Sequence, residues 1–237
     1  MEKINTIIIN QSWGCGDIIF SQFIANRFVK EGYKVLWPVQ DIYAPLAKHF
    51  PHITMVDKSL VNIDYMRRDA YEFNGCRVIP LRFADSLCCV PYTDCMKAKA
   101  ILLDMDWQEW KKDCIIERDF ANEKKLYHEV LKLHPNEKYN LISDQFTTGG
   151  ARTIPIEEPN NGLRNVHMKF IEGFTLIDWL MVYQGAQNIF AVASSNIYLF
   201  ELFPVKAQIN LFIRRPNEQN HDNYSYLLTK DNYILHP

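Results

Sequence analysis

A short turn near the start of the chain combines the residue types that acid–base chemistry requires. It reads Gly14-Cys15-Gly16-Asp17, follows an apolar run, and is followed directly by an apolar helical pattern. The glycines allow a ligand to approach the backbone closely, and a carboxylate in the first turn of the helix can accept a proton from a bound hydroxyl. Aspartate is also a preferred helix-capping residue. The turn alone leaves Asp17 open between a general base and a cap.

A second polar turn, Ser194-Ser195-Asn196, follows the apolar run NIFAVA and precedes another helical pattern. Two hydroxyls and the unpaired N–H groups of a helix start can hold a diphosphate. Glu201, farther along that helix, can reach ribose hydroxyls. An ordinary N-cap explains the same three residues.

Arg152 follows a small polar loop at 147–150. A guanidinium at that position can bind phosphate oxygens and stabilise a departing nucleoside diphosphate. Because surface arginines are common, this position is only one candidate among the chain's basic residues.

The triplet Asp104-Met105-Asp106 follows an apolar run and matches the D-x-D pattern with which some sugar transferases bind a divalent metal. Asp106 also leads directly into a helical pattern that begins at Trp107, so capping explains it without a metal. We therefore treat a metal site here as an alternative and expect no metal.

Common signatures of other enzyme classes are missing from the sequence. The first turn continues as G-C-G-D-I-I, so Ile19 stands where a dinucleotide-binding fingerprint requires glycine or alanine. The 7 histidines show no metal-ligand spacing, and the 6 cysteines contain no CxxC pair. Neither a G-x-S-x-G motif nor a phosphate-binding loop motif is present. The sequence therefore does not support a dehydrogenase, a hydrolase or a nucleoside triphosphatase. The cysteines are expected to be reduced structural thiols.

The composition is that of a globular protein with a packed core, since 48% of the 237 residues are hydrophobic and 23% are charged. A formal net charge of −2 and a pI near 6.4 supply no general positive field for nucleic acid or anionic lipid. The first residues contain only a three-residue isoleucine run, too short for a signal-peptide core or a membrane span. We expect a cytoplasmic protein with a small-molecule or carbohydrate partner, no nucleic acid and no membrane span.

Apolar patterning predicts alternating strands and helices in the first half of the chain. Residues 4–10 indicate a strand buried on both faces, the pattern from Gly16 to Gly32 a helix, and residues 33–39 a second strand. Such a strand–helix–strand unit is almost always right-handed. Further short elements are expected, namely a helix at 41–51, strands at 53–57 and 76–84, and a strand or helix at 100–104.

A second series of the same kind follows a charged, helix-favouring stretch. Its expected elements are strands at 139–143, 165–170, 188–193 and 207–213, with helices at 175–186 and 196–204. We therefore predict an α/β fold of two Rossmann-like domains, residues 1–106 and 136–237, joined by a helical connector at 107–135. Their parallel sheets are expected to face each other across a cleft.

Two stretches, 14–53 and 174–203, resemble the bacterial heptosyltransferases of glycosyltransferase family 9, which have the two-domain GT-B fold, and related viral or phage-type sugar transferases. The first is similar to the family's opening Gly-Asp turn, long helix, strand and helix that ends at a proline. The second is similar to the C-terminal helix, Gly-Ala turn, strand, hydroxyl turn and helix that hold the donor nucleotide. Together they cover roughly a third of the chain.

The resemblance implies an inverting, metal-independent transfer of sugar from a nucleotide-sugar co-substrate to a hydroxyl of a carbohydrate acceptor. It makes the N-terminal domain the acceptor side and the C-terminal domain the donor side, and it matches Asp17 to the family's proposed base. Combined with the turns described above, it gives the predicted substrate-binding residues Ser12, Gly14, Gly16, Arg152, Thr175, Ser194, Ser195, Asn196 and Glu201.

Two positions depart from the family pattern. The family has an aspartate before the hydroxyl residues and a histidine a few positions later, whereas this sequence has Ala193 and Tyr198. These departures keep a second hypothesis open, a module that binds sugar nucleotides without turning them over. A third hypothesis is a metal-dependent transferase that uses Asp104 and Asp106.

Overall fold

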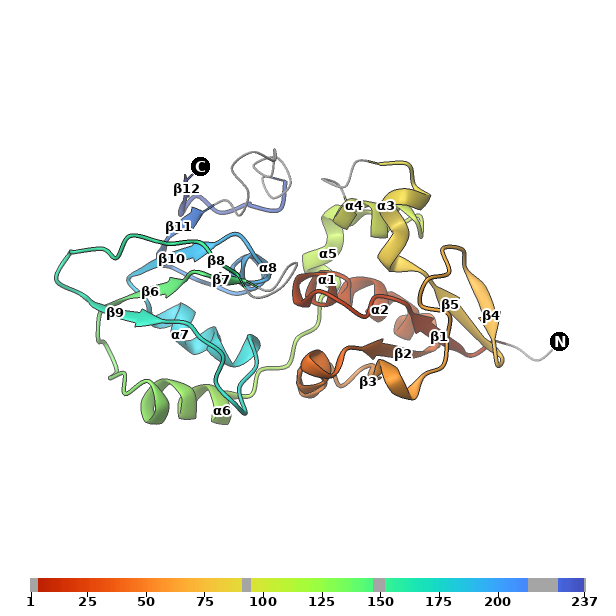
Figure 1. The fold of residues 1–237 in the computed structure, drawn as a ribbon, viewed down its shortest axis with the longest axis horizontal. Coiled ribbons are helices and arrows are strands. Elements are labelled where there is room, and N and C mark those ends of the chain that lie inside the picture. Colours follow the sequence, from red (N-terminus) through yellow and green to blue (C-terminus); the bar gives the residue numbers. More distant parts are fainter. Residues whose placement is uncertain (1–3, 91–94, 147–151, 213–225, 237) are drawn as a thin grey trace. The chain divides into compact units, whose positions relative to one another are not determined.

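The chain forms two compact units, Met1–Glu117 and Arg118–Pro237. Figure 1 shows the computed structural model, which describes residues 4–90, 95–146, 152–212 and 226–236. Each unit is built on a five-stranded sheet in which nearly all neighbouring strands are parallel. The predicted pair of Rossmann-like α/β domains is confirmed. The boundary between the units lies inside the charged stretch at 107–135.

The sheet of the first unit is wound outward from its central strand in both directions. From edge to edge its strands are β3 (Thr54–Asp57), β2 (Lys34–Val39), β1 (Thr6–Ile9), β5 (Cys76–Ile79) and β4 (Tyr71–Phe73). The chain runs from β1 through β2 to β3 and then returns to the other side of β1 with β5, which is also parallel to β1. The strand order therefore reverses between β1 and β5, and ligands of open parallel sheets bind beyond the carboxyl ends of the strands at such a point.

The short strand β4 pairs antiparallel with β5 and was not predicted. Its three residues are half-buried or exposed, as expected at a sheet edge, so the sequence there carries no buried run. The predicted strand at 76–84 ends early, at Ile79, because Pro80 has no N–H group for a sheet hydrogen bond.

Helical segments cover this sheet. They are α1 (Cys15–Phe20), α2 (Gln22–Lys30), η1 (Asp41–His49), η2 (Lys58–Leu60), η3 (Leu81–Phe83), α3 (Ala84–Leu87), α4 (Cys95–Ile101), η5 (Trp107–Glu109) and α5 (Trp110–Asp113). The single helix expected after Gly16 is divided at Ser21. Of the two alternatives for residues 100–104, the strand is wrong, because α4 extends to Ile101 and buries Ala98 and Ala100.

The sheet of the second unit consists entirely of parallel pairs among the described residues. Its strands in order are β12 (Tyr233–His236), β11 (Gln208–Phe212), β10 (Asn188–Val192), β6 (Tyr139–Ser143) and β9 (Arg164–His167). The chain goes from β6 to β9 and returns to β10 on the other side of β6, so the strand order reverses between β6 and β10. A short antiparallel pair, β7 (Gln145–Phe146) and β8 (Arg152–Thr153), lies outside this sheet.

The helical segments of the second unit are α6 (Phe120–Lys124), η6 (Lys125–Val130), η7 (Ile177–Trp179), α7 (Leu180–Gly185) and α8 (Asn196–Leu202). Among the helices of the described ranges, none combines the length and the apolar character needed to cross a bilayer.

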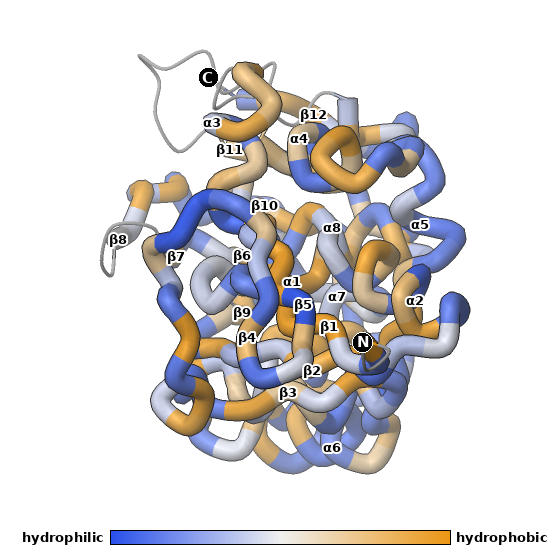
Figure 2. The backbone as a smooth tube through the Cα atoms, turned by 90° about the vertical axis from the view of Figure 1, so that its right-hand side faces the viewer, coloured by the Kyte–Doolittle hydropathy of each residue, from blue (hydrophilic) through white to orange (hydrophobic). Residues whose placement is uncertain are grey.

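Central strands and helix faces form the core of each unit. The three isoleucines of β1, Ile7–Ile9, are at most 2% exposed, and the hydropathy colouring of Figure 2 shows this strand as an apolar segment. In the second unit all five residues of β6 are buried. A strand buried on both faces tends to be a continuous apolar run, which is why the sequence located β1 directly. β6 was located from Tyr139, Leu141 and Ile142, although it also buries Asn140 and Ser143.

Candidate functional site

Asp17 lies at the point of the first unit where the strand order reverses. It belongs to α1, in the connection that leaves the carboxyl end of β1. Its Oδ1 is 3.0 Å from Nζ of Lys99 on α4. The Asp17 side chain is 29% exposed, whereas that of Lys99 is 4% exposed. A ligand can therefore reach the carboxylate from solvent while the paired ammonium remains buried.

Lys99 is a site residue that the sequence did not reveal. Besides the ion pair with Asp17, its Nζ donates to Oε1 of Gln11 at 2.9 Å and to the carbonyl oxygen of Leu81 at 3.3 Å. The three donors of the ammonium thus have three acceptors. In the run MKAKAI a lysine is normally expected to face solvent. The one signal that Lys99 is buried is its position three residues after Met96, on the same face of the helix, because Met96 is buried.

Gly14 makes room for the Asp17 side chain. Gly14 has a φ of 81°, and a Cβ added there would lie 2.3 Å from Oδ2 of Asp17. Its carbonyl accepts the N–H of Ile18 at the start of α1. Within the described residues no backbone N–H donates to the Asp17 carboxylate, so the helix-cap alternative gains no support.

The two other residues predicted in this turn have structural positions. Ser12 is buried, donates from Oγ to the carbonyl of Pro38 at 2.9 Å, and so links the turn to β2. Gly16 is the second residue of α1 and is half-buried. Their substrate contacts remain predictions.

The thiol of Cys95 lies in the electric field of the Asp17–Lys99 pair. Burial, and then the negative charge of Asp17, raise the pKa of Cys95 to about 11, although the nearby ammonium of Lys99 acts in the opposite direction. The thiol is therefore protonated at neutral pH and is a poor nucleophile. Asp17, and not Cys95, is the group of this cluster that can accept a proton.

Two cations lie near the ring of Trp13, the residue directly before Gly14. The guanidinium carbon of Arg82 lies 3.9 Å from the centre of a Trp13 ring, and Nζ of Lys58 lies 4.4 Å from it. Tyr65 meets Trp13 edge-on, with ring centres 6.4 Å apart. Within the described residues neither cation forms an ion pair with a carboxylate. Sequence reasoning missed this cluster, since its members come from four separate segments.

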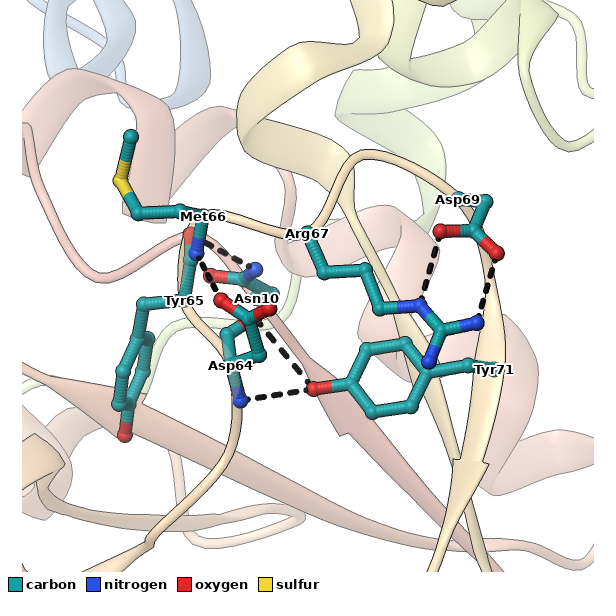
Figure 3. A network of polar contacts seen from close by, with 7 residues as sticks. All are labelled: Asn10, Asp64, Tyr65, Met66, Arg67, Asp69 and Tyr71. Atoms are coloured by element: carbon teal, nitrogen blue, oxygen red, sulfur yellow. Dashed lines mark hydrogen bonds and ion pairs between the residues drawn. The ribbon is translucent and has the colours of Figure 1, made fainter.

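A network of hydrogen bonds shapes the loop that contributes Tyr65, as Figure 3 shows. Nδ2 of Asn10 donates to the carbonyl of Tyr65 at 3.3 Å, and the N–H of Asp64 donates to the Tyr71 hydroxyl at 3.0 Å. Arg67 donates two hydrogen bonds to the carboxylate of Asp69, from Nε to Oδ1 at 2.8 Å and from Nη2 to Oδ2 at 2.9 Å. The loop is thereby attached to the end of β1, directly before the Asp17 turn.

The predicted anion-binding turn of the second unit follows the carboxyl end of β10, beside β6, where the strand order reverses. Ser194 donates from Oγ to Oδ1 of Asn196 at 3.2 Å, and Nδ2 of Asn196 lies 3.4 Å from Oγ of Ser143 at the end of β6. Ser195, at the N-cap of α8, makes no side-chain capping bond. The turn therefore lies at the reversal point of this sheet, as Asp17 does in the other, but it follows the returning strand β10, whereas Asp17 follows the first strand β1.

Glu201 and Thr175 form bonds that hold the fold. Glu201 is 5% exposed and accepts bonds from the Thr229 hydroxyl at 2.7 Å and from the Tyr233 hydroxyl at 2.8 Å. Burial, together with the charge of Glu201, raises the pKa of Tyr233. Thr175 donates from Oγ1 to Asp178 at 2.8 Å beside η7. Ligand contacts of both residues stay predictions.

Arg152 begins β8, where it pairs with Phe146 of β7. The polar loop at 147–150, named with it in the sequence, lies outside the described residues. The role of Arg152 toward phosphate stays a prediction.

The carboxylate of Asp106 caps η5, since its Oδ1 accepts the N–H of Gln108 at 2.9 Å. Asp104 adopts a positive φ of 51° after α4. In the part of the chain that the structure describes, no group of three or more His, Cys, Asp or Glu side chains is placed to hold a metal ion.

This fold, with its two reversal points at the carboxyl ends of parallel strands, is one that glycosyltransferases adopt. The structure is similar to that of TibC, an iron-containing dodecameric glycosyltransferase from enterotoxigenic E. coli H10407, with a TM-score of 0.52 and 12% identity over 90% of this chain and 58% of that chain. A structure of TibC, described as a heptosyltransferase, in complex with ADP-D-beta-D-heptose gives a TM-score of 0.50 and 12% identity over 90% and 59%.

A family 9 glycosyltransferase from Veillonella parvula DSM 2008 gives a TM-score of 0.48 and 9% identity over 99% of this chain and 88% of that chain. This chain spans less than two thirds of the length of TibC. No family model and no curated protein sequence matches it. The likeness to TibC confirms the fold that the sequence resemblance implied.

Proposed function

We propose that this chain transfers a sugar from a nucleotide-sugar donor to a hydroxyl of a carbohydrate acceptor, with inversion and without a metal. The observation that carries the proposal is the partly exposed Asp17 carboxylate at the strand-order reversal, paired with a buried lysine. The fold shared with glycosyltransferases supports it, as does the ADP-heptose complex of one of them. The proposal includes a cytoplasmic location and no nucleic-acid partner, in keeping with the net charge of −2.

Asp17 acts as the general base in this proposal. Its Oδ2 has no partner among the described residues and takes the proton of the acceptor hydroxyl. The acceptor oxygen forms a bond to the anomeric carbon from the face opposite the diphosphate. The bond between that carbon and the diphosphate oxygen breaks, and its electron pair leaves with the nucleoside diphosphate. General-base assistance of this kind contributes about 10²–10⁴-fold to the rate.

The departing diphosphate is bound by the second unit in this proposal. The backbone N–H groups and hydroxyls of Ser194 and Ser195, together with the guanidinium of Arg152, neutralise the charge that develops on it. Positively charged and N–H donors replace a metal in this role, so the nucleotide sugar is a co-substrate and no cofactor is required.

Nucleoside diphosphates are expected to stabilise the protein against heat. A ligand at a hundred times its Kd adds about 2.7 kcal/mol to the folded state, which raises Tm by several degrees. A thermal-shift screen of nucleoside diphosphates and nucleotide sugars measures this. Arg152→Met should weaken binding by about tenfold or more, because charge-assisted hydrogen bonds contribute about 1.5–3 kcal/mol. The control is Arg27→Met, which removes an exposed arginine paired with Glu31. A screen without any shift contradicts the donor assignment.

A non-catalytic binding module is the second candidate function. It is favoured by Ala193 and Tyr198, which are 3% and 2% exposed and occupy the places of the family's aspartate and histidine. Nucleotide-induced stabilisation without donor hydrolysis or sugar transfer would support this function over the first. Turnover of any donor rejects it.

Sugar transfer is expected to continue in the presence of a chelator. Asp106→Asn should change the rate by less than about twofold, because asparagine caps η5 as well as aspartate does. The measurement is the transfer rate with and without EDTA. Activity that EDTA abolishes and Mn²⁺ or Mg²⁺ restores would instead establish the metal-dependent hypothesis.

A further inference from the structure

Lys99 is a buried cation whose position is fixed from three directions. Its side chain is 4% exposed, and its acceptors are Oδ1 of Asp17, Oε1 of Gln11 and the carbonyl of Leu81. These acceptors come from α1, from the turn after β1 and from the first residue of η3, which follows β5. The ammonium therefore joins the segments that follow the two strands between which the sheet order reverses, and Asp17 is its partly exposed partner.

A longer chain of hydrogen bonds attaches this ammonium to the turn. Gln11 is 4% exposed, and its Nε2 donates to the carbonyl of Trp13 at 2.7 Å, while its Oε1 accepts from Lys99. The amide of Gln11 thus has both ends occupied and cannot rotate without losing one bond. The backbone of the turn, Gln11, Lys99 and Asp17 are held as one rigid set.

The two carboxylate oxygens of Asp17 have different surroundings. Oδ1 faces the ammonium of Lys99, and Oδ2 lies against Gly14, where a Cβ would be only 2.3 Å away. The side chain is therefore held on both sides, and Oδ2 is the oxygen left for a proton. Burying the ammonium of Lys99 costs free energy, which its three hydrogen bonds offset. The partly exposed Asp17 carboxylate could be solvated by water, so folding alone does not require a buried lysine beside it.

We propose that Lys99 is a positioning residue for the proposed glycosyl transfer: it fixes the carboxylate of Asp17 so that Oδ2 faces the acceptor hydroxyl. Lys99 itself does not touch substrate. This inference rests on the proposed function, in which Asp17 is the base. A base displaced by about 1 Å can lose about 10²-fold in rate, so a small rotation of Asp17 is sufficient for a large effect.

The test compares Lys99→Met with Lys97→Met, a matched control that removes a half-buried lysine two residues earlier on α4. Lys99→Met is expected to lower kcat by about 10²-fold while donor KM changes less than about threefold. Lys99→Arg, which retains the charge, should recover part of the rate. Combining Lys99→Met with Asp17→Asn should add little to the loss from Asp17→Asn alone, because both act through one group. If the loss in the double variant instead equals the product of the two single-variant losses, the proposal is wrong.

A crystal structure of the Lys99→Met variant separates this inference from the proposed function. Rotation of Asp17 away from Gly14 is expected, and an unmoved Asp17 overturns the positioning role whether or not transfer is found. Full activity of Asp17→Asn, in contrast, rejects the base while the structural result stands. If Lys99→Met does not fold, Gln11→Met removes one acceptor of the same ammonium and is expected to show the same kcat loss to a smaller degree.

Discussion

Replacing Asp17 with asparagine is expected to lower sugar transfer by at least about 10²-fold, the lower end of what general-base assistance contributes. The amide is nearly the same size as the carboxylate, and its oxygen can still face the Lys99 ammonium that lies 3.0 Å from Oδ1. It cannot accept the proton of an acceptor hydroxyl. The loss should therefore appear in kcat, measured with saturating donor, because the change removes an interaction made only in the transition state.

Nucleotide binding provides the internal control for this variant. The diphosphate ligands are assigned to the second unit, so the Kd of the nucleoside diphosphate should stay within about twofold of that of the unmodified protein. Asp119→Asn is a matched aspartate change, because Asp119 caps α6 and asparagine caps equally well. Turnover of Asp17→Asn close to that of Asp119→Asn would remove Asp17 from the mechanism and leave the carboxylate with a structural role alone.

The sequence predicted the central elements of both sheets because burial on both faces leaves a clear signal. β1 carries three consecutive isoleucines, and β6 is buried throughout although it includes the polar residues Asn140 and Ser143. The polar turns that follow β1 and β10 were predicted to face ligands, and that prediction stays open. Edge strands carry no such signal. β12 was not predicted, because its apolar run is only three residues long, Tyr233–Leu235, and as an edge strand it leaves Ile234 and Leu235 41% and 39% exposed.

The sequence predicted the residues of the candidate site that lie in local turns, but not those that long-range contacts bring to it. Asp17 and Ser194–Asn196 are marked by local turn chemistry, which depends on neighbours in sequence. Lys99 meets Gln11 across 88 positions of the chain, and it also bonds the carbonyl of Leu81 at the start of η3. Arg82 and Lys58 reach Trp13 in the same nonlocal way. One sequence contains no information on such pairs beyond the helix face on which Lys99 lies.

Gly14 links the backbone of the turn to the chemistry of its carboxylate. A φ of 81° requires a residue without the steric limits of a side chain, and this alone would explain a glycine. The 2.3 Å approach of Asp17 Oδ2 to the missing Cβ gives a second and separate reason. The two reasons predict different results, since the first concerns stability and the second concerns the orientation of Asp17.

Gly14→Ala is therefore expected to lower transfer by about 10²-fold and also to destabilise the first unit. With a φ of 81° and a ψ of 107°, the backbone of Gly14 lies outside even the left-handed helical region, so it costs an alanine at least about 1–2 kcal/mol. The new methyl group displaces the Asp17 side chain, which is the more flexible partner, and a base moved by about 1 Å loses about 10²-fold in rate. Displacement also weakens the ion pair of a buried ammonium, so the free energy of unfolding should fall by more than the backbone cost.

Gly32→Ala separates the two effects. Gly32 has a φ of 88°, close to that of Gly14, but a Cβ added there meets nothing within 4 Å. A backbone cost of about 1–2 kcal/mol is expected for Gly32→Ala, with transfer by the folded protein changed less than about twofold. Denaturant unfolding and kcat for both variants provide the comparison. Equal kcat values in the two variants would mean that the Asp17 carboxylate does not need its place against Gly14, and the geometry assigned to the base would be wrong.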